Sequence, residues 1–417
     1  MIVLRGRWVL PITGAPLLNG WCAVEHGRIA ALGRAGSSLP FRDNAPLVDL
    51  GAMAVLPALV NAHTHLELSW LRGRLPPSTA FPEWVRLMLE IRAREAPPAD
   101  VVEATVRDAI TEARASGTGA IGDVTNTLAS VAPLRESRLR GVIFHELLRF
   151  AADGADDVLE AALLAEQRYG DAERFPVAMA AHAPYSVSPA LFQGIRAVLA
   201  RTPFLPSTVH LGESPEEMEL LASGTGSIRT LLEDLQAWDD GWVPPRCGPV
   251  EYLDRMKLLD HRLLAVHGTQ LPDAELSRLA ARGCTLVTCP RSNRFVGAGE
   301  PPVGRFFAAG VSVAVGTDSL ASNKDLNLFA ELAELRRMAP TVPAGALLAC
   351  ATEGGARALR CQDDLGALEP GRAAALIAVE VPSGVTDVEE YLVQGIHPEQ
   401  VHWVADLLED YQLTIDD

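Results

Sequence analysis

From residue 53 onward, short apolar runs alternate with longer segments whose apolar residues recur every three or four positions. The short runs are typical of buried β-strands, and the longer pattern is typical of amphipathic helices. The predicted strands cover residues 54–62, 119–124, 141–147, 176–182, 207–211, 263–268, 285–289 and 312–318. The clearest helical stretches cover residues 100–116, 156–170, 188–201, 273–283 and 326–338. Strands and helices that alternate in this way predict an α/β fold, a (β/α)8 TIM barrel.

A doubly wound open sheet is the alternative fold for such a pattern. Its usual mark, a glycine-rich phosphate loop after the first strand, is missing from the sequence. Two long connections, residues 66–98 and 222–256, follow the first and fifth predicted strands. Barrel enzymes form their pockets from loops at this end of the strands, so the connections favour the barrel.

Both ends of the chain lack this alternation of strand-like and helix-like segments. Residues 2–10 and 22–33 alternate short apolar runs with turn residues, and Gly27 suits a tight hairpin turn. Residues 365–381 indicate strand, turn and strand, with the turn at Pro370–Gly371. We therefore expect a small β-sandwich-like domain formed from both chain ends. The predicted boundaries are 1–52 and 361–417 for the two parts of this domain and 53–360 for the barrel.

Polar side chains stand at or just after the ends of several predicted strands, where burial without a partner would be costly. They are His63, His65, His182, His210, Glu213, His267 and Asp318. Because the strand ends of a barrel meet at one face, these side chains are expected to converge. One explanation covers the whole set, namely a metal ion in a hydrolytic site.

The first two histidines have the most informative spacing. His63 and His65 are two positions apart on a strand, so they point to the same side and can reach one ion. Any one of the histidines alone would be interpreted as an ordinary core or surface residue. Together with His210, His267 and Asp318 at further strand ends, they predict a shared divalent metal.

The charge and the apolar content of the chain limit which partners the protein could bind. The formal net charge of −17 argues against nucleic acid and against anionic membrane surfaces, because both attract basic proteins. No apolar stretch approaches the length of a membrane span, and Pro11 and Gly14 interrupt the apolar N-terminal run that a signal peptide would need. The six cysteines form no CxxC pair. We expect a cytoplasmic protein, and the sequence leaves open whether it forms a homo-oligomer.

Six short segments resemble those of one enzyme family. NAHTHLELSWLRG, HAPYS, HLGES, VHG, CPRSN and GTDSLASN resemble the cytosine-deaminase and chlorohydrolase-like branch of the amidohydrolase superfamily. The resemblance covers nearly the whole chain, including the β-unit built from both ends. The HLELSWL form of the first segment is most similar to the aminodeoxyfutalosine deaminases of menaquinone biosynthesis.

The resemblance implies a role for each strand-end residue. The implied metal ligands are His63, His65, His210 and Asp318. Glu213 would shuttle protons, His267 would orient the attacking water, and His182 would contact the substrate. Asp318 would also accept a proton from the water.

Glu213 has an alternative interpretation as an acidic residue in the first turn of a helix, favoured by the helix dipole. The neighbouring Glu216 and Glu217 are interpreted only in this way. The position of Glu213, three residues beyond His210, favours catalysis.

Lysine usage bears on the number of metal ions. Members of the superfamily with two metals bridge them through a modified lysine on the fourth strand, and residues 176–182 contain none. The two lysines, Lys257 and Lys324, lie on no predicted barrel strand. We therefore expect one divalent metal ion per chain. Three imidazoles and a carboxylate suit zinc, iron or manganese, and we expect zinc.

These features predict a deaminase that removes the exocyclic amine from the adenine-type ring of a small nucleoside-like substrate, specifically 6-aminodeoxyfutalosine. Alternatives with the same site chemistry are adenosine, S-adenosylhomocysteine, guanine, cytosine or triazine substrates. A non-catalytic barrel is a further alternative, which the complete set of ligand positions opposes.

The candidate substrate contacts besides His182 are Glu67, Trp84 and Arg149. Trp84 lies in the long first loop and is expected either to cover a purine face or to pack internally. Glu67 is expected to meet a polar part of the substrate or to form an internal ion pair. A benzoate on the substrate would require an arginine, and the alternatives to Arg149 are Arg72 and Arg291.

Overall fold

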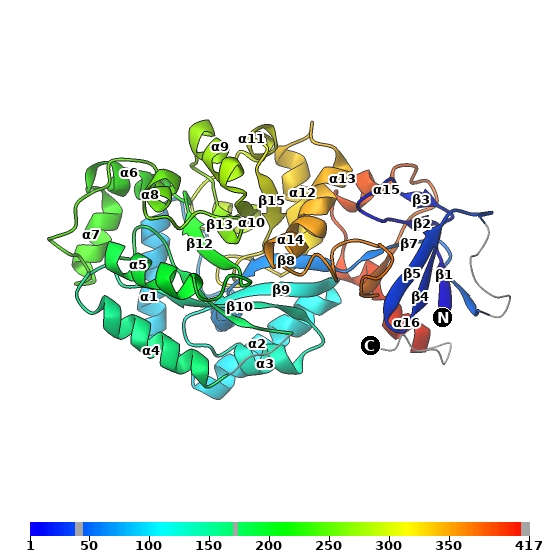
Figure 1. The fold of residues 1–417 in the computed structure, drawn as a ribbon, viewed down its shortest axis with the longest axis horizontal. Helices are drawn as coiled ribbons and strands as arrows, with labels where there is room; N and C mark the ends of the chain where they lie inside the picture. The colour runs from blue at the N-terminus through cyan, green and yellow to red at the C-terminus, as the bar shows by residue number, and fades with distance from the viewer. Residues whose placement is uncertain (38–44, 170–173, 410–417) are drawn as a thin grey trace.

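Two four-stranded parallel sheets form the centre of the protein (Figure 1). The computed structural model describes residues 1–37, 45–169 and 174–409. The first sheet contains β8 (Leu59–Thr64), β9 (Thr118–Thr125), β10 (Arg140–Leu147) and β11 (Val177–Ala181). The second contains β12 (Ser207–Leu211), β13 (Leu263–His267), β14 (Thr285–Thr288) and β15 (Ser312–Val315). In both sheets the strands lie side by side in sequence order, and neighbouring strands are parallel.

Helices follow these strands, and the five predicted helical stretches are confirmed. They are α2 (Ala99–Ala115), α4 (Ala155–Gln167), α5 (Pro189–Leu199), α9 (Asp273–Arg282) and α12 (Leu328–Met338). Gly170, the last residue of one predicted stretch, lies outside the described residues. The sequence explains the start of α5, because the Ser188 hydroxyl accepts a hydrogen bond from the Leu191 N–H at 3.2 Å and Pro189 occupies the first turn.

Further helices occupy the connections. They are η1 (Leu66–Leu71), α1 (Phe81–Glu95), α3 (Val131–Glu136), α6 (Pro215–Ser223), α7 (Ser227–Asp234), α8 (Pro249–Arg255), α10 (Pro290–Phe295), α11 (Val303–Ala308), α13 (Ala344–Cys350), α14 (Glu353–Ala358), α15 (Val388–Leu392), η2 (Pro398–Gln400) and α16 (Val404–Glu409). The first long connection thus holds η1 and α1, and the second holds α7 and α8. Among the described residues, no helix combines the length and the apolar content that crossing a bilayer requires.

The two parallel sheets meet at both of their edges. At one edge the His210 N–H donates to the His182 carbonyl at 2.8 Å, and at the other the Asp318 N–H donates to the His63 carbonyl at 3.1 Å. Alternate residues of the strands share one buried cluster that includes Val60, Phe144, Ala180 and Val266 and therefore draws on both sheets. The same alternation places the opposite residues of each strand against the helices.

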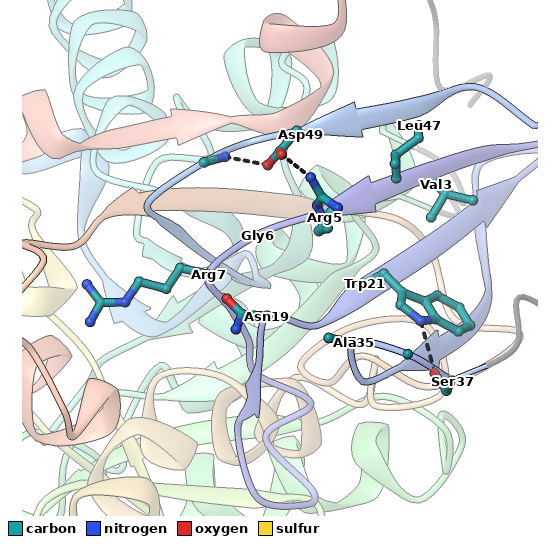
Figure 2. A pocket seen from close by; sticks show the side chains of 12 residues that line it. Val3, Arg5, Gly6, Arg7, Asn19, Trp21, Ala35, Ser37, Leu47 and Asp49 are labelled. Atoms are coloured by element: carbon teal, nitrogen blue, oxygen red, sulfur yellow. Dashed lines mark hydrogen bonds and ion pairs between the residues drawn. The ribbon is translucent and has the colours of Figure 1, made fainter.

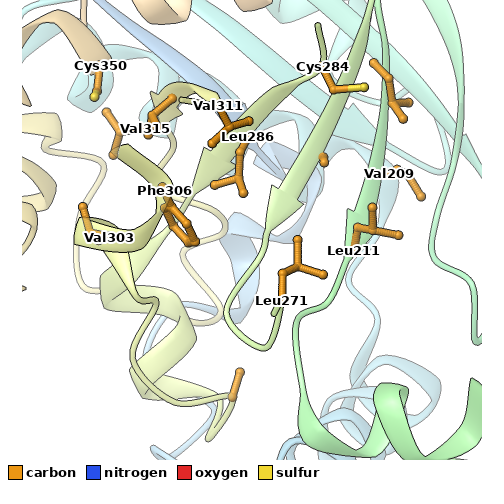
Figure 3. Packing of buried hydrophobic residues seen from close by; sticks show 14 of the residues in the cluster. Val209, Leu211, Leu271, Cys284, Leu286, Val303, Phe306, Val311, Val315 and Cys350 are labelled. Carbon is orange, nitrogen blue, oxygen red and sulfur yellow. The ribbon is translucent and has the colours of Figure 1, made fainter. Parts of the chain in front are cut away.

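This outer layer is well filled near the second sheet (Figure 3). Val209 and Leu211 of β12, Leu286 of β14 and Phe306 of α11 belong to one buried cluster. Each of the four side chains is at most 2% exposed. The strands are therefore held rigidly from outside, and their ends are fixed platforms for polar side chains.

Two further sheets lie beside the parallel sheets (Figure 1). The first is built from N-terminal strands alone, and the second combines strands from both ends of the chain. One has the order β5-β4-β1-β6, from β1 (Ile2–Arg5), β4 (Trp21–Glu25), β5 (Arg28–Gly33) and β6 (Leu47–Asp49). The other has the order β17-β16-β7-β2-β3, from β2 (Trp8–Val9), β3 (Leu17–Leu18), β7 (Met53–Pro57), β16 (Leu376–Glu380) and β17 (Val401–Trp403). Leu4, Val24, Val55 and Leu376 share a buried cluster that joins the two sheets. The predicted hairpin is confirmed, with Gly27 at a φ of 68° between β4 and β5.

Two strand predictions were wrong. The predicted strand 54–62 is divided at Ala58 into β7, which pairs with β16 and β2, and β8, which pairs with β9. The predicted strand before the Pro370–Gly371 turn is absent, since Gly366 adopts a φ of 87° and the Leu368 N–H donates to the Pro11 carbonyl instead. Residues 410–417 of the C-terminal segment lie outside the described residues.

A cavity of about 510 Å³ lies on the sheet that contains β1, β4 and β6 (Figure 2). Arg5 and Asp49 form an ion pair on its wall, and the Trp21 indole N–H donates to the Ser37 hydroxyl at 3.2 Å. None of the predicted metal ligands lines this cavity. The strand-end polar residues therefore form a separate site.

Candidate metal centre

Four side chains from three strand ends converge at the carboxyl ends of the parallel strands. His63 is the last residue but one of β8 and His65 follows the strand, His210 lies on β12, and Asp318 follows β15. The Nε2 atoms of His65 and His210 are 3.2 Å apart. Asp318 Oδ1 lies 3.9 Å from His63 Nε2 and 3.8 Å from His65 Nε2. The structure thus brings together the four predicted metal ligands.

The imidazoles of this cluster suit a metal ion because they are buried and neutral. Neither ring nitrogen of His63 has a hydrogen-bond partner, although its side chain is only 1% exposed. Burial lowers the pKa of His63 well below its usual value and lowers the pKa of His65 to about 3. Burial also lowers the pKa of His210. Buried nitrogen lone pairs without a proton or partner are the donors that a divalent cation requires.

Surrounding groups orient two of the ligands. His210 Nδ1 donates to the His182 carbonyl at 3.0 Å, which leaves Nε2 without a proton and directed at the cluster. Asp318 accepts hydrogen bonds from the Ser292 hydroxyl at 2.6 Å and the Ser319 N–H at 2.8 Å. Burial opposes ionisation of Asp318, but the nearby imidazoles and the Ser292 hydrogen bond outweigh it, so the pKa of this carboxyl is lowered.

His267 and Glu213 form a second pair beside the cluster. His267 Nδ1 donates to Asn293 Oδ1 at 2.7 Å, and the Asn293 amide donates to the Thr269 hydroxyl at 2.9 Å. This arrangement directs His267 Nε2 at Glu213 Oε1, 3.5 Å away. Burial lowers the pKa of His267 to about 4. Burial, followed by the charges of Asp318 and Glu217, raises the pKa of Glu213 well above its usual value, as a proton donor requires.

The backbone at the strand ends is strained where it carries these groups. His267 and Asp318 adopt φ values of 77° and 58°, which are uncommon for residues other than glycine. Such conformations persist only where the surrounding contacts hold them and occur often at functional sites. Gly316 permits one of these contacts, because a Cβ there would lie 2.8 Å from the His63 carbonyl oxygen.

Glu217 has a more specific role than that of an acid in the first turn of a helix. Its two carboxylate oxygens accept hydrogen bonds from the Gly212 N–H at 3.1 Å and the Glu213 N–H at 2.9 Å. The Ser214 hydroxyl caps α6 by accepting from the Glu217 N–H at 3.3 Å. Glu217 therefore fixes the backbone that carries Glu213. The Ser-x-x-Glu pattern predicts a helix cap but does not reveal this reach to the preceding residues.

The predicted substrate contacts lie in different surroundings. His182 lies at the site, with its ring centroid 4.9 Å from that of His210 and its Nδ1 2.5 Å from the Ser186 hydroxyl. Trp84, on α1, is buried in the large hydrophobic cluster. Arg149 is exposed and donates to the Asp153 carbonyl at 3.1 Å.

Glu67 is held by the loop after β9. Its carboxylate accepts hydrogen bonds from the hydroxyls of Thr125 and Thr127, each at 2.6 Å, and from the N–H groups of Asn126 and Thr127 at 2.9 and 3.1 Å. The structure gives Glu67 four internal hydrogen-bond donors, and the predicted substrate contact stays a prediction. This arrangement differs from the alternative of an internal ion pair, because all four donors are uncharged.

Two residues at the site were not predicted. Glu146, at the end of β10, is 4% exposed, and its Oε1 lies 3.4 Å from His210 Nδ1 without a hydrogen-bond partner. Tyr185 is buried, and burial followed by the charge of Glu213 raises the pKa of its hydroxyl well above the usual value. Glu146 lies at the end of a predicted strand, as several of the histidines do, so the same reasoning from strand ends could have identified it. Tyr185 lies within the HAPYS segment, but nothing in its position along the chain links it to Glu213.

The model of one protein family matches this chain over residues 54–406, and its description is "Amidohydrolase family". The chain belongs to the amidohydrolase family. It is accordingly a hydrolase that acts on C–N bonds. The matched range includes every residue of the metal cluster as well as Glu213 and His267.

Several known proteins are similar along most of their length. A 5-methylthioadenosine/S-adenosylhomocysteine deaminase of Desulforudis audaxviator is 29% identical over 385 residues, which cover 90% of this chain and 84% of that protein. An aminodeoxyfutalosine deaminase of Deinococcus radiodurans is 32% identical over 316 residues, which cover 73% and 72%. The crystal structure of an adenosine deaminase from Xanthomonas campestris with bound zinc superposes with a TM-score of 0.81 at 26% identity, covering 96% of this chain and 90% of that one.

Proposed function

We propose that this hydrolase is a metal-dependent deaminase that removes the exocyclic amine from the adenine ring of a small nucleoside-like substrate. The observation that carries the proposal is the pairing of Glu213 with His267 Nε2 at 3.5 Å, directly beside the cluster of His63, His65, His210 and Asp318. Deamination requires both a water nucleophile and a nearby proton donor. The names of the similar proteins support the same reaction.

Each residue of the site has its own role in the proposed reaction. A divalent ion held by the three histidines and Asp318 would lower the pKa of water towards neutrality and so supply the nucleophile. His267 Nε2 orients the water, and Asp318 accepts its proton. Glu213 donates a proton to the ring nitrogen beside the attacked carbon. The proton taken up by Asp318 passes to the amine, which leaves as ammonia, and the proton of the added hydroxyl returns to Glu213 as the carbonyl forms. His182 contacts the substrate.

We propose one metal ion per chain, and we propose zinc. The fourth strand, β11, contains no lysine that could bridge a second ion. The zinc in the similar adenosine deaminase structure supports the metal. We further propose that the two parallel sheets close into one (β/α)8 barrel within residues 53–360, and that residues 1–52 and 361–417 form a β-sandwich-like domain to which β7 (Met53–Pro57) also contributes a strand. The hydrogen bonds at both sheet edges support closure.

For the substrate we propose 6-aminodeoxyfutalosine, which would place the enzyme in menaquinone biosynthesis. The HLELSWL segment and the aminodeoxyfutalosine deaminase at 32% identity support this substrate. The second candidate is 5-methylthioadenosine or S-adenosylhomocysteine, because deaminases of that name match over a larger share of the chain. The cytoplasmic location stays a prediction.

Ammonia release from a panel of adenosine derivatives tests the proposal. The zinc-loaded enzyme is expected to deaminate 6-aminodeoxyfutalosine with the highest kcat/KM among these compounds. A higher kcat/KM for S-adenosylhomocysteine would replace the substrate but keep the reaction. Absence of ammonia from every adenine compound in the panel would reject the proposed function.

A further inference from the structure

One face of α1 is directed at the end of β11. The Phe81 ring lies 6.2 Å from the Tyr185 ring, which lies 5.6 Å from the His182 ring. Arg92 follows Phe81 by eleven positions, which at about 100° per residue returns to nearly the same face of the helix. Helical side chains also lean towards the helix N-terminus, so the Arg92 side chain extends back towards Phe81 and the site.

Arg92 is distinguished by its lack of a partner. Several of the described arginines form no hydrogen bond or ion pair. All of them are exposed except Arg92, which is half-buried. Its positive charge reaches His182, whose pKa is lowered to about 4 by burial first and by Arg92 second. A partly buried cation without a counterion is unfavourable, and a bound anion would relieve it.

The other arginines near the pocket loops already have partners. Arg72 pairs with Glu112, and Arg291 pairs with Asp325 at 2.7 Å. Arg149 is exposed and bound to a backbone carbonyl. The guanidinium groups of Arg72 and Arg291 are therefore occupied, whereas Arg149 uses only its Nε in this contact and differs from Arg92 in being exposed.

The floor of the site is where the metal ligands meet, beside the proton donor. The ring that loses its amine must lie there, within reach of Glu213 and of the cluster that includes Asp318, so the tail of the substrate has to extend away from the floor. Arg92 lies on a helix that borders the site and not on a strand end. A substrate whose ring sits at the floor would therefore present its anionic tail to α1.

We infer that Arg92 determines specificity by binding a carboxylate on the tail of the substrate, remote from the ring that loses its amine. This inference rests on the proposed function. A guanidinium presents two parallel N–H donors that match a carboxylate, so Arg92 would favour adenosines with an acidic 5′ substituent over neutral ones. S-adenosylhomocysteine carries such a carboxylate, as does 6-aminodeoxyfutalosine, and 5-methylthioadenosine does not.

The test compares one acidic and one neutral ligand. S-adenosylhomocysteine and 5-methylthioadenosine are titrated into the zinc-loaded enzyme by calorimetry, and their turnover is measured by ammonia release. Arg92→Met is expected to weaken binding of the acidic ligand at least 30-fold and of the neutral one less than threefold, with the effect on turnover in KM and not kcat. Arg92→Lys, which keeps the charge but loses the planar fork, should be intermediate. Arg94→Met, an exposed arginine on the same helix without a partner, is the matched control and should change neither ligand.

The outcomes distinguish the inferred role of Arg92 from the proposed deaminase function on which it rests. Equal losses for both ligands in Arg92→Met would overturn the inference and indicate a structural role, and no loss for either would also overturn it. Failure of the wild-type enzyme to bind either ligand counts against it as well. If ligands bind but none of them is deaminated, the proposed function fails, while a carboxylate-dependent affinity that Arg92→Met removes would still support the role of Arg92.

Discussion

Glu217→Gln tests whether the contacts behind the site position its proton donor. The substitution keeps the shape of the side chain but replaces one of the two oxygens that accept from the Gly212 and Glu213 N–H groups. One hydrogen bond to a buried carboxyl oxygen is lost, and a buried N–H is left facing an amide NH2 group. Together these effects are expected to lower the free energy of unfolding by about 2–3 kcal/mol.

This loss of unfolding free energy corresponds to a measurable decrease in Tm. With about 2.1 cal/mol/K of unfolding entropy per residue, a chain of 417 residues loses roughly 1 °C of Tm per kcal/mol, so we expect a decrease of about 2–3 °C. Displacement of the Glu213 carboxyl should lower kcat by about 10- to 100-fold and leave KM nearly unchanged. Thermal unfolding and steady-state ammonia release measure the two effects.

Glu216→Gln is the matched control, since it removes the same charge from the same turn of α6 at a residue whose Oε2 has no hydrogen-bond partner. Its Tm is expected to stay within about 1 °C of wild type, as for most substitutions that break no specific contact. Equal Tm and kcat values for Glu217→Gln and Glu216→Gln would refute the reasoning.

Three further predictions concern the site itself. Glu213→Gln should lower kcat by about 1000-fold while elemental analysis finds unchanged metal content, and a near-normal rate would contradict its role as proton donor. Asn293→Ala should lower Tm by about 1–3 °C, because His267 Nδ1 loses its buried acceptor, and an unchanged Tm would contradict that contact. Since the pKa of His65 is lowered to about 3, its imidazole needs no deprotonation at neutral pH. Metal affinity should therefore be flat from pH 8 to pH 6 and fall only as the pH approaches about 3, and a tenfold loss already by pH 6 would contradict the lowered pKa.

From the sequence, helices and strands could be predicted where buried residues recur at a regular spacing along the segment. The helix α2 and the strand β12 are recognisable because burial of one face, or of alternate residues, repeats along the segment. The division of residues 54–62 into β7 and β8 was not predictable from this signal. Both halves are apolar and buried, and they differ only in the strands with which they pair.

The same limit applies to the site. His63, His210 and Asp318 could be proposed as ligands because each is a polar residue at the end of an apolar strand. Glu217 and Arg92 could not be assigned their roles, since each lies on a helix and its significance depends on groups brought near by folding. For Glu67 the sequence identified a residue close to the ligands but not the threonine-rich loop that binds it.

The most direct test of the central claim is anomalous X-ray diffraction at the zinc edge from crystals of the zinc-loaded enzyme. One peak per chain is expected, at about 2.0–2.2 Å from nitrogen atoms of His63, His65 and His210 and from an Asp318 carboxylate oxygen. A peak bound elsewhere, a second peak of equal height, or no peak within bonding distance of these four side chains would contradict the account.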